Sequence, residues 1–330
     1  MKYERLGHSG LTVSKLCFGG GSLGVGTLQP GKVKNFDQKG SNEVVARSIA
    51  AGITFFDTSD AYLFGEAETA LGGALGVKRK DIVLATKCGL AWGPAQTNKG
   101  GLSARHIVQS CDESLRRLKT DWIDIYQSHS PDRITPMEET VRAFDQLIRA
   151  GKVRYAGICN YPAWKVAQYQ ALQDKLGCSR VLSNQVEYSM MGRGAERELV
   201  PLAKDSGLGV IVYQALAAGF LTGKYTRQNP RPEGGRRSNE EYDRRHAIDR
   251  ERGYDLIEAL QEIAPRYKAT VAQITLAWTM SRPNINSVIF GVSKLEQLDE
   301  NVKSADINLS EEDTARIDKL TALEASRRGE

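Results

Sequence analysis

Four side chains that can hold or transfer a proton are grouped around the second to fourth apolar runs of the chain. Asp57, Lys87 and His129 each come at the end of such a run, and Tyr62 follows Asp57 by five residues. A buried lysine beside a phenol favours the phenolate and lowers the pKa of the phenol, and a neighbouring carboxylate keeps that lysine charged. The phenol is then expected to donate a proton near neutral pH, while the histidine orients a carbonyl oxygen. The set predicts hydride delivery from a bound cofactor, with the protein supplying geometry and a proton.

Each of these residues, taken alone, has an ordinary structural explanation. An aspartate at a strand end often forms a turn or a cap, an isolated tyrosine usually packs, and a lysine is usually solvated. His129 precedes Ser130 and Pro131 and fits a hydrogen bond within a loop. Only the ordered set, with each residue tied to its own strand end, favours the catalytic interpretation over these alternatives.

Eight apolar runs, each followed by a helix-like pattern, supply the elements that position these side chains. The runs are continuous, as expected for parallel strands buried on both faces. The predicted strands cover residues 13–18, 54–56, 82–86, 123–128, 153–158, 181–185, 209–213 and 287–290. The helical patterns open near Ser41 and then cover residues 66–75, 103–118, 136–150, 162–175, 195–206, a region after Gly253, and 294–305. Eight such units predict a closed (β/α)8 TIM barrel, an α/β fold whose C-terminal mouth brings the four residues side by side.

Segments outside the eight units are expected to close the ends of the chain. Residues 2–5 and 12–14 flank a turn-like segment and predict an N-terminal β-hairpin that plugs one end of the barrel. An additional C-terminal helix is expected from Leu309 through Leu323, with residues 326–330 frayed. At 330 residues, the whole chain is expected to form one barrel domain.

A doubly wound open sheet is the structural alternative. Gly19, Gly21 and Gly24 fit the G-x-G-x-x-G spacing that marks a dinucleotide-binding turn in such folds. The helix that should begin inside this motif is missing, because Gly26 and Pro30 follow. The barrel is therefore the favoured prediction.

Residues 226–252 depart from the repeat. They are rich in arginine and in acids, and they contain several prolines and glycines. One interpretation is a solvated loop that leads into a helix. The other is a flap that closes over a bound anion, because the segment follows a strand on the face where barrel active sites lie.

Composition excludes several classes of function. The formal charge of +5, from 45 basic and 40 acidic residues, gives little field for holding nucleic acid. The chain has no apolar stretch long enough for a membrane helix and no signal-peptide core at its start, so a cytoplasmic location is expected. The cysteines are odd in number and lack the spacing of a zinc or dithiol site, so no metal is expected and free thiols are; they are Cys17, Cys88, Cys111, Cys159 and Cys178.

The chain resembles an aldo-keto reductase over nearly its whole length. Four segments carry the resemblance: Leu6-Gly7-x-Ser9-Gly10-Leu11-x-Val13-Ser14, Phe56-Asp57-Thr58-x-x-x-Tyr62-x-x-Gly65-x-x-Glu68, Thr86-Lys87, and Gln127-x-His129. The resemblance implies a (β/α)8 barrel with an NAD(P)(H) cofactor extended across its mouth. It also implies that Tyr62 is the general acid and base, assisted by Asp57, Lys87 and His129, in the interconversion of an aldehyde or ketone and an alcohol.

The resemblance further implies three cofactor segments. The first holds the nicotinamide carboxamide through Asn160 and Gln185, and Cys159 there stands where many relatives have serine. In the second, an aromatic ring stacks on the nicotinamide and the backbone wraps the pyrophosphate, and its candidates are Tyr213, Leu216, Gly219, Leu221 and Lys224. In this segment Gln214 and Ala215 replace the more usual serine and proline. The third takes the adenosine phosphate, and its candidates are Gly291, Ser293, Lys294, Gln297, Glu300 and Asn301.

The third segment also has a physical logic of its own. Ser293 is expected to cap a helix, Lys294 adds a cation, and Gln297 and Asn301 follow on one helical face. Such an arrangement predicts an anion site at a helix start. Lys294 favours NADP(H) over NAD(H).

Four aromatic residues just past strand ends are candidates for the wall of an apolar substrate pocket, and two of them are as readily ordinary core; they are Phe18, Phe64, Trp92 and Tyr161. A small carbonyl compound or alcohol is the expected substrate. The sequence specifies neither the natural substrate nor an oligomeric state. Two other functions stay open: a cofactor-sensing regulatory subunit of the kind that accompanies membrane channels in relatives with this barrel, and a barrel hydrolase or lyase that uses Asp57 and His129 without nicotinamide.

Overall fold

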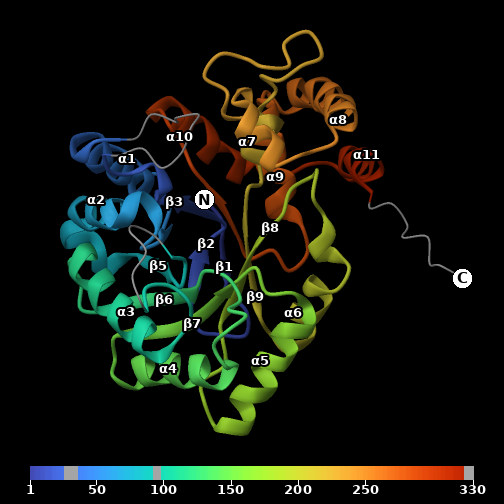
Figure 1. The fold of residues 1–330 in the computed structure, drawn as a ribbon. Coiled ribbons are helices and arrows are strands. Elements are labelled where there is room, and N and C mark those ends of the chain that lie inside the picture. The colour runs from blue at the N-terminus through green and yellow to red at the C-terminus, as the bar shows by residue number, and fades with distance from the viewer. Residues whose placement is uncertain (26–35, 92–97, 323–330) are drawn as a thin grey trace, which may run out of the picture.

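Eight parallel strands close into a barrel in the order β10-β3-β4-β5-β6-β7-β8-β9, with helices around the outside (Figure 1). The computed structural model describes residues 1–25, 36–91 and 98–322. The strands are β3 (Leu16–Gly19), β4 (Phe55–Asp57), β5 (Val83–Cys88), β6 (Ile123–Ser128), β7 (Val153–Cys159), β8 (Ser183–Glu187), β9 (Gly209–Tyr213) and β10 (Ser287–Phe290). The predicted (β/α)8 barrel is therefore confirmed.

The helices follow the strands in the predicted alternation. They are α1 (Gln38–Ala50), α2 (Glu66–Leu75), α3 (Ala104–Leu118), α4 (Met137–Arg149), α5 (Ala163–Leu176), α6 (Leu199–Ser206), α7 (Glu240–Arg245), α8 (Arg250–Ile263), α9 (Val271–Ser281), α10 (Leu295–Asn301) and α11 (Glu311–Thr321). None of the helices in the described ranges is both long enough and apolar enough to cross a bilayer.

Alternation of side chains along each strand decides which residues face the barrel axis. The inner apolar cluster includes residues from each of β3 to β6, among them Cys17, Phe55, Ala85 and Ile125. Because the side-chain period of a strand is two, the residue two positions further on faces the same way. At the carboxyl ends of these strands those residues are Gly19, Asp57, Lys87 and Gln127. The barrel therefore has an apolar lower interior and a polar upper layer.

The predicted N-terminal hairpin is confirmed. Strands β1 (Tyr3–Arg5) and β2 (Thr12–Ser14) pair in antiparallel register. Leu6 and Val13 of this hairpin have no exposed surface and belong to the inner cluster of the barrel. The hairpin thus closes the amino end and leaves the carboxyl end as the mouth.

Several element boundaries differ from the sequence predictions. Helix α1 begins at Gln38, because Asp37 accepts the Gly40 amide as its N-cap, and not near Ser41. Helix α8 begins at Arg250, before Gly253. Helix α9 was not predicted as a separate element. The sequence expectations for residues 26–31, Leu323 and 326–330 concern parts of the chain outside the described residues.

The 226–252 segment forms a 3₁₀ turn at Arg236–Ser238, helix α7 and the start of α8 (Figure 1). The side chain of Arg237 is buried, with 2% of its surface exposed. Its Nε donates to the carbonyl of Ala217 at 2.9 Å, and its Nη1 donates to Asp243 at 3.0 Å and to the carbonyl of His246 at 2.7 Å. The segment is therefore bound to the loop that follows β9.

Candidate active site

The side chains of Asp57 and Lys87 meet at the floor of the mouth. Lys87 has no exposed surface, and Asp57 has 2%. The Nζ of Lys87 donates to Asp57 Oδ1 at 2.5 Å, to the carbonyl of Thr58 at 2.8 Å and to the hydroxyl of Tyr62 at 3.3 Å. The ammonium group thus donates three hydrogen bonds, and these offset the cost of burying its charge away from water.

Opposing influences set the protonation of Lys87. Burial alone lowers the pKa of its amine, but the charges of Asp57 and Tyr62 outweigh it, so the pKa lies above the ordinary value. Lys87 is therefore charged at neutral pH. A cation is thereby held beside the phenol of Tyr62, at the place where negative charge would develop on its oxygen.

Tyr62 differs from the sequence expectation in the direction of its pKa shift. Burial raises the pKa of the Tyr62 hydroxyl, and the charge of Lys87 offsets only part of that effect. The expectation of a lowered pKa was wrong, because desolvation of the phenolate outweighs its attraction to the lysine. Tyr62 is a protonated phenol at neutral pH, which is the form that donates.

His129 lies against the same phenol. Its ring meets the ring of Tyr62 edge-on, with 5.8 Å between centroids, and its Nδ1 is 3.0 Å from the hydroxyl oxygen of Ser59. Burial lowers the pKa of His129 to about 3, and the charge of Lys87 adds to this effect. The imidazole is therefore neutral. The structure brings Asp57, Tyr62, Lys87 and His129 together. Each comes from the strand end or loop that was predicted for it.

Sequence reasoning did not assign a role to Gln127, which supports Asp57 from the other side. Its Nε2 donates to Asp57 Oδ2 at 3.2 Å, and its Oε1 lies 3.7 Å from the Sγ of Cys159. Burial raises the pKa of the Cys159 thiol, so the thiol keeps the proton that it donates to Gln127. The sequence contained a sign of this role: Gln127 lies in β6 two residues after Ile125, which belongs to the inner cluster, and so faces the axis.

The candidate carboxamide residues lie beside this group. Gln185 is buried and donates from Nε2 to Asp57 Oδ2 at 2.8 Å. Asn160 is exposed, has a left-handed backbone with φ of 61°, and donates to the carbonyl of His129 at 3.4 Å. The hydroxyl of Tyr213 donates to Asn160 Oδ1 at 3.0 Å. The candidates for nicotinamide stacking and for carboxamide binding therefore touch one another at the mouth.

The loop after β9 has an unusual backbone. Gln214, Ala217 and Ala218 have φ of 60°, 47° and 56°, which is uncommon for residues other than glycine. The carbonyl of Leu216 accepts the amides of Gly219 and Leu221. Strained residues of this kind often mark sites that bind ligands.

Leu221 itself points away from the mouth. Its side chain has no exposed surface and packs in the main core. Its carbonyl accepts a hydrogen bond from Thr275 at 3.2 Å, and its amide donates to Leu216. Both backbone groups of Leu221 are thus engaged within the protein.

Three cations from different segments are close enough for the charges of two of them to act on the third. Burial and the charges of Arg236 and Lys294 lower the pKa of Lys224. Within the described residues, none of the three forms an ion pair with a carboxylate. Like charges that are gathered without acids create a positive potential suited to a phosphate. Arg236, from the 226–252 segment, was not among the sequence candidates.

The segment after β10 differs in detail from its prediction. Lys294, and not Ser293, is the N-cap of α10, and the amide and hydroxyl of Ser293 donate instead to the side chain of Gln297 at 2.8 and 3.2 Å. The Oε1 of Glu300 accepts from Thr270, which caps α9. Asn301 is buried, and Gly291 is exposed just after the strand.

The aromatic candidates for a substrate wall fall in different environments. Phe18 has no exposed surface and packs against Phe56 and Phe290 between barrel and helices. Tyr161 is also buried, against Tyr169, and accepts a hydrogen bond from Ser128. These two are core residues: Phe18 points outward from β3, and Tyr161 lies in the segment between β7 and α5.

Phe64, in the loop after β4, is 56% exposed and remains a candidate for the rim of the mouth. Trp92 lies outside the described residues.

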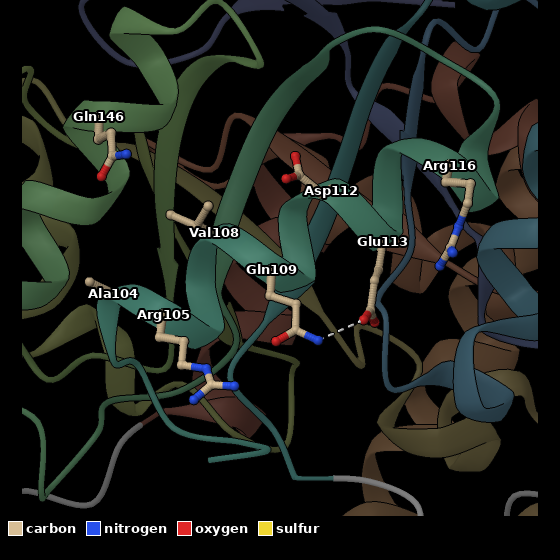
Figure 2. Close-up of a pocket in the computed structure, with 8 residues that line it drawn as sticks. All are labelled: Ala104, Arg105, Val108, Gln109, Asp112, Glu113, Arg116 and Gln146. Atoms are coloured by element: carbon tan, nitrogen blue, oxygen red, sulfur yellow. Dashed lines mark hydrogen bonds between the residues drawn. The ribbon is translucent and has the colours of Figure 1, made fainter.

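A solvent-exposed groove of about 760 Å³ runs along the outer face of α3. Figure 2 shows its side chains, among them Arg105, Asp112, Glu113, Arg116 and, from α4, Gln146. These side chains carry mixed charges, and none of the residues at the mouth lies among them. The chemistry therefore belongs to the mouth, where the ionisable groups are buried and paired.

Comparison with known proteins agrees with this geometry. The model of the aldo/keto reductase family matches residues 15–322. A probable voltage-gated potassium channel subunit beta from Arabidopsis thaliana is 35% identical over 314 residues, which are 93% of this chain and 92% of that protein. The NADH-specific methylglyoxal reductase of Escherichia coli is 32% identical over 339 residues, covering 98% of this chain and 100% of that protein. The versiconal hemiacetal acetate reductase of Aspergillus parasiticus is 31% identical over 350 residues and covers both chains fully.

Proposed function

Because this chain belongs to the aldo/keto reductase family, we propose that it is an oxidoreductase that interconverts a carbonyl compound and an alcohol, with NADP(H) as its cofactor. The observation that carries the proposal is the contact of one buried ammonium with both a carboxylate and a phenol. Lys87 Nζ lies 2.5 Å from Asp57 and 3.3 Å from Tyr62. Tyr62 is the general acid in carbonyl reduction and the general base in alcohol oxidation.

The side chains at the mouth divide the work of proton transfer. A bound nicotinamide supplies or accepts the hydride. Tyr62, protonated at neutral pH because burial raises its pKa, gives its proton to the carbonyl oxygen as charge develops there. The phenolate that remains lies beside the ammonium of Lys87, which stabilises it, and Asp57 keeps that ammonium in place.

His129 orients the substrate. The Ser59 hydroxyl lies 3.0 Å from Nδ1 of His129 and 3.2 Å from Asp60 Oδ1, and it has one proton for the two acceptors. In the tautomer in which it donates to Nδ1, the ring hydrogen is on Nε2 and the imidazole presents a donor to a carbonyl oxygen. The low pKa of His129 keeps it a neutral donor, so it does not compete with Tyr62 as the acid. The two rings then hold one oxygen between them.

The cofactor assignment rests on residues that fit its parts. Gln185 donates to Asp57 through Nε2, which leaves its Oε1 to accept from a carboxamide. Tyr213 offers an aromatic face at the mouth. Lys224, Arg236 and Lys294 supply positive charge for phosphate groups, and this charge favours NADP(H) because its adenosine ribose carries an additional phosphate. We place the protein in the cytoplasm, where this cofactor and free cysteines are expected.

A second candidate function is a cofactor-sensing regulatory subunit. The Arabidopsis relative, 35% identical, is named as a channel subunit. Such a protein would bind the nucleotide through the same residues without rapid turnover. The same measurements distinguish the two functions.

Replacing Tyr62 by phenylalanine tests the proposal. Loss of the acid should lower kcat for reduction of a panel of aldehydes and ketones by about 100- to 10,000-fold. Binding of NADPH, followed by fluorescence titration, should stay within about twofold of wild type, because the ring is kept. The matched control is Tyr169→Phe, which removes a buried hydroxyl that has no hydrogen-bond partner. It should leave kcat unchanged.

The outcomes are distinct. Equal turnover in Tyr62→Phe and wild type would contradict the assigned acid. Tight NADPH binding by both proteins with no turnover on the panel would favour the regulatory function. Failure of both NADPH and NADH to bind would contradict the cofactor proposal and favour a reaction without nicotinamide.

A further inference from the structure

Glu68, in the first turn of α2, is a carboxylate with no exposed surface that the proposed reaction does not use. Its Oε2 accepts from Nε of Arg117, in the last turn of α3, at 2.7 Å. Its Oε1 accepts from the hydroxyl of Thr86, in β5, at 2.5 Å. A buried carboxylate is retained only when it is paired and hydrogen-bonded in this way. Glu68 therefore connects α2, α3 and β5 on the outside of the barrel wall.

Both residues that bind Glu68 are next to a group at the mouth of the barrel. Thr86 immediately precedes Lys87 in β5, and because successive side chains alternate, Thr86 faces the helices while Lys87 faces the axis. The side chain of Arg117 lies directly on Gly65: a Cβ built there would lie 2.9 Å from its Cδ and 3.0 Å from its Nε. Gly65 ends the short turn that Tyr62 begins. Arg117 thus covers the backbone of that turn.

The turn itself has an unfavourable backbone. Leu63, Phe64 and Gly65 follow Tyr62 with φ of 50°, 56° and 91°. Left-handed conformation is unfavourable for leucine and phenylalanine, and it persists only where the surroundings enforce it. Leu63 is buried, whereas Phe64 is 56% exposed. The contact of Arg117 with Gly65 supplies an external constraint on this turn.

We propose that the buried ion pair of Glu68 and Arg117 positions Tyr62. It holds the left-handed turn against β5 and so keeps the hydroxyl of Tyr62 within reach of Lys87. The inference rests on the proposed function, because Tyr62 is assigned there as the proton donor. Glu68 is a positioning residue that acts through Tyr62. In the described part of the chain its side chain hydrogen-bonds to Thr86 and Arg117 and not to Tyr62 or Lys87.

The first test is Glu68→Gln, which keeps an acceptor for Thr86 but removes the carboxylate charge 2.7 Å from Arg117, which also pairs with Glu113 at 3.6 Å. Because a displacement of about 1 Å can cost 100-fold in rate, we expect kcat to fall by about 10- to 100-fold. KM and the NADPH dissociation constant should stay within about twofold, because the residues proposed to hold the cofactor are untouched. Arg117→Lys keeps the ion pair and should retain more activity than Glu68→Gln.

A matched control separates positioning from general stability. Asp124 and Arg79 form a comparable pair at the amino end of β5 and β6, at 2.8 Å, with side-chain exposures of 15% and 8%. Asp124→Asn should lower the melting temperature and leave kcat within about twofold. An equal loss of kcat in Asp124→Asn and Glu68→Gln would overturn the proposal.

A double variant tests whether Glu68 acts through Tyr62. Once Tyr62→Phe has removed the proton donor, adding Glu68→Gln should cost no further kcat, because its only effect is on the placement of that donor. A structural defect would instead lower kcat by the same factor in both backgrounds. Additive losses would therefore overturn the inference.

Hydrogen exchange provides a measurement that does not depend on turnover. The amide of Glu66 donates to the carbonyls of Leu63 and Tyr62, so its protection reports whether the turn is closed. Peptides covering residues 61–69 should exchange at least about tenfold faster in Glu68→Gln than in wild type, and those of Asp124→Asn should not. If wild type shows no turnover, the proposed function fails while this result still supports the positioning. Unchanged exchange in Glu68→Gln would contradict it.

Discussion

Two neutral groups lie near a charged lysine at the centre of the candidate active site. Burial raises the pKa of Tyr62 and lowers that of His129, so that both stay uncharged near neutral pH. Lys87 keeps its charge because Asp57 is within 2.5 Å. This distribution leaves one mobile proton, that of Tyr62. It follows that the pH dependence of the reaction should report the phenol and not the imidazole.

The low pKa of His129 gives a test at low pH. An imidazole with an ordinary pKa near 6.5 would become charged as the pH falls through that value. His129, with a pKa of about 3, stays neutral, so kcat for carbonyl reduction should not change as the pH falls from about 7.5 to about 5. Steady-state rates across this range measure it. A fall in kcat centred near pH 6.5 would mean that His129 is solvated.

The same shift links His129 to stability. The unfolded chain binds a proton on this histidine below its ordinary pKa of 6.5, whereas the folded chain does so only below about 3. The free energy of unfolding therefore falls as the pH decreases through this window, by up to about 1.4 kcal/mol per pH unit. Urea unfolding of wild type and His129→Asn should show a steeper decline for wild type. Parallel declines would contradict a buried neutral imidazole.

At the scale of single residues, the sequence specifies which groups meet but not how far they are desolvated. Asp57, Lys87 and His129 were placed at strand ends, and the barrel brings them together. The direction of the Tyr62 shift was wrong because burial outweighs the lysine. The burial of Glu68 could have been predicted from the sequence, because other buried positions of α2 lie three, four and seven residues after it. Nothing in the sequence indicates that Arg117, 49 residues away, is the partner of Glu68.

At the scale of elements, the 226–252 segment contains a buried side chain and a helix and is not a bare loop. Arg237 is bound on one side to Ala217, in the strained loop after β9, and on the other to Asp243. Arg250 donates to the second oxygen of Asp243 at 2.7 Å. The interpretation of residues 226–252 as a solvated loop that leads into a helix agrees with the start of α8 at Arg250 but not with the burial of Arg237. Both α7 and the loop after β9 depend on this one guanidinium.

Replacing Arg237 by methionine should loosen both elements. The change leaves the carbonyl of Ala217 without its donor and Asp243 with one partner fewer, and breaking such a buried pair costs roughly 3 kcal/mol or more. Urea unfolding should show that loss, and limited proteolysis should cut faster within 226–252. NADPH should also bind more weakly, because the loop after β9 is proposed to hold its pyrophosphate.

Arg227 provides the matched control. It pairs with Glu251, Asp255 and Glu258 on the surface, with 34% of its side chain exposed. Arg227→Met should cost no more than about 1 kcal/mol, because exposed ion pairs contribute little. Equal losses in the two variants would mean that Arg237 is no more than another surface contact.

The helices α3 and α4 were predicted, whereas α9 was not. Helices α3 and α4 have one apolar face and were predicted to within a residue or two of both ends. Helix α9 is buried at all but one position, so no polar face reveals its period. The left-handed backbone at Leu63, Phe64 and Ala217 was not predicted, because these residue types do not specify it and the surrounding packing imposes it.

At the scale of the whole molecule, the order of eight buried strands was enough to predict the barrel. Parallel strands covered on both faces are continuous apolar runs, and closure follows when eight such runs alternate with helices. The hairpin was predicted from a turn between two short segments ahead of the main fold, and it was expected to plug one end of the barrel. The structure shows why that cover is needed, because the inner cluster would otherwise meet water at the amino end.

Leu6 makes the hairpin part of the barrel core. It has no exposed surface, and a Cβ on Gly209, at the start of β9, would lie 2.6 Å from its Cδ1. Leu6→Ala should therefore lower the free energy of unfolding by about 2–5 kcal/mol, as for other large-to-small changes in a core. Urea unfolding should remain a single transition, because the inner cluster joins the hairpin to the strands of the barrel.

The control for this change is Val77→Ala, at a residue that is 85% exposed, which should alter stability by no more than about 0.5 kcal/mol. NADPH binding to folded Leu6→Ala should match wild type, because the hairpin lies at the end opposite the mouth. A separate early transition in Leu6→Ala, followed by unfolding at the wild-type midpoint, would show that the hairpin is an appendage. A single transition at lower urea would show that the hairpin and the barrel unfold as one unit. The residues at the mouth would then depend for their folded positions on a core that extends to the opposite end of the barrel.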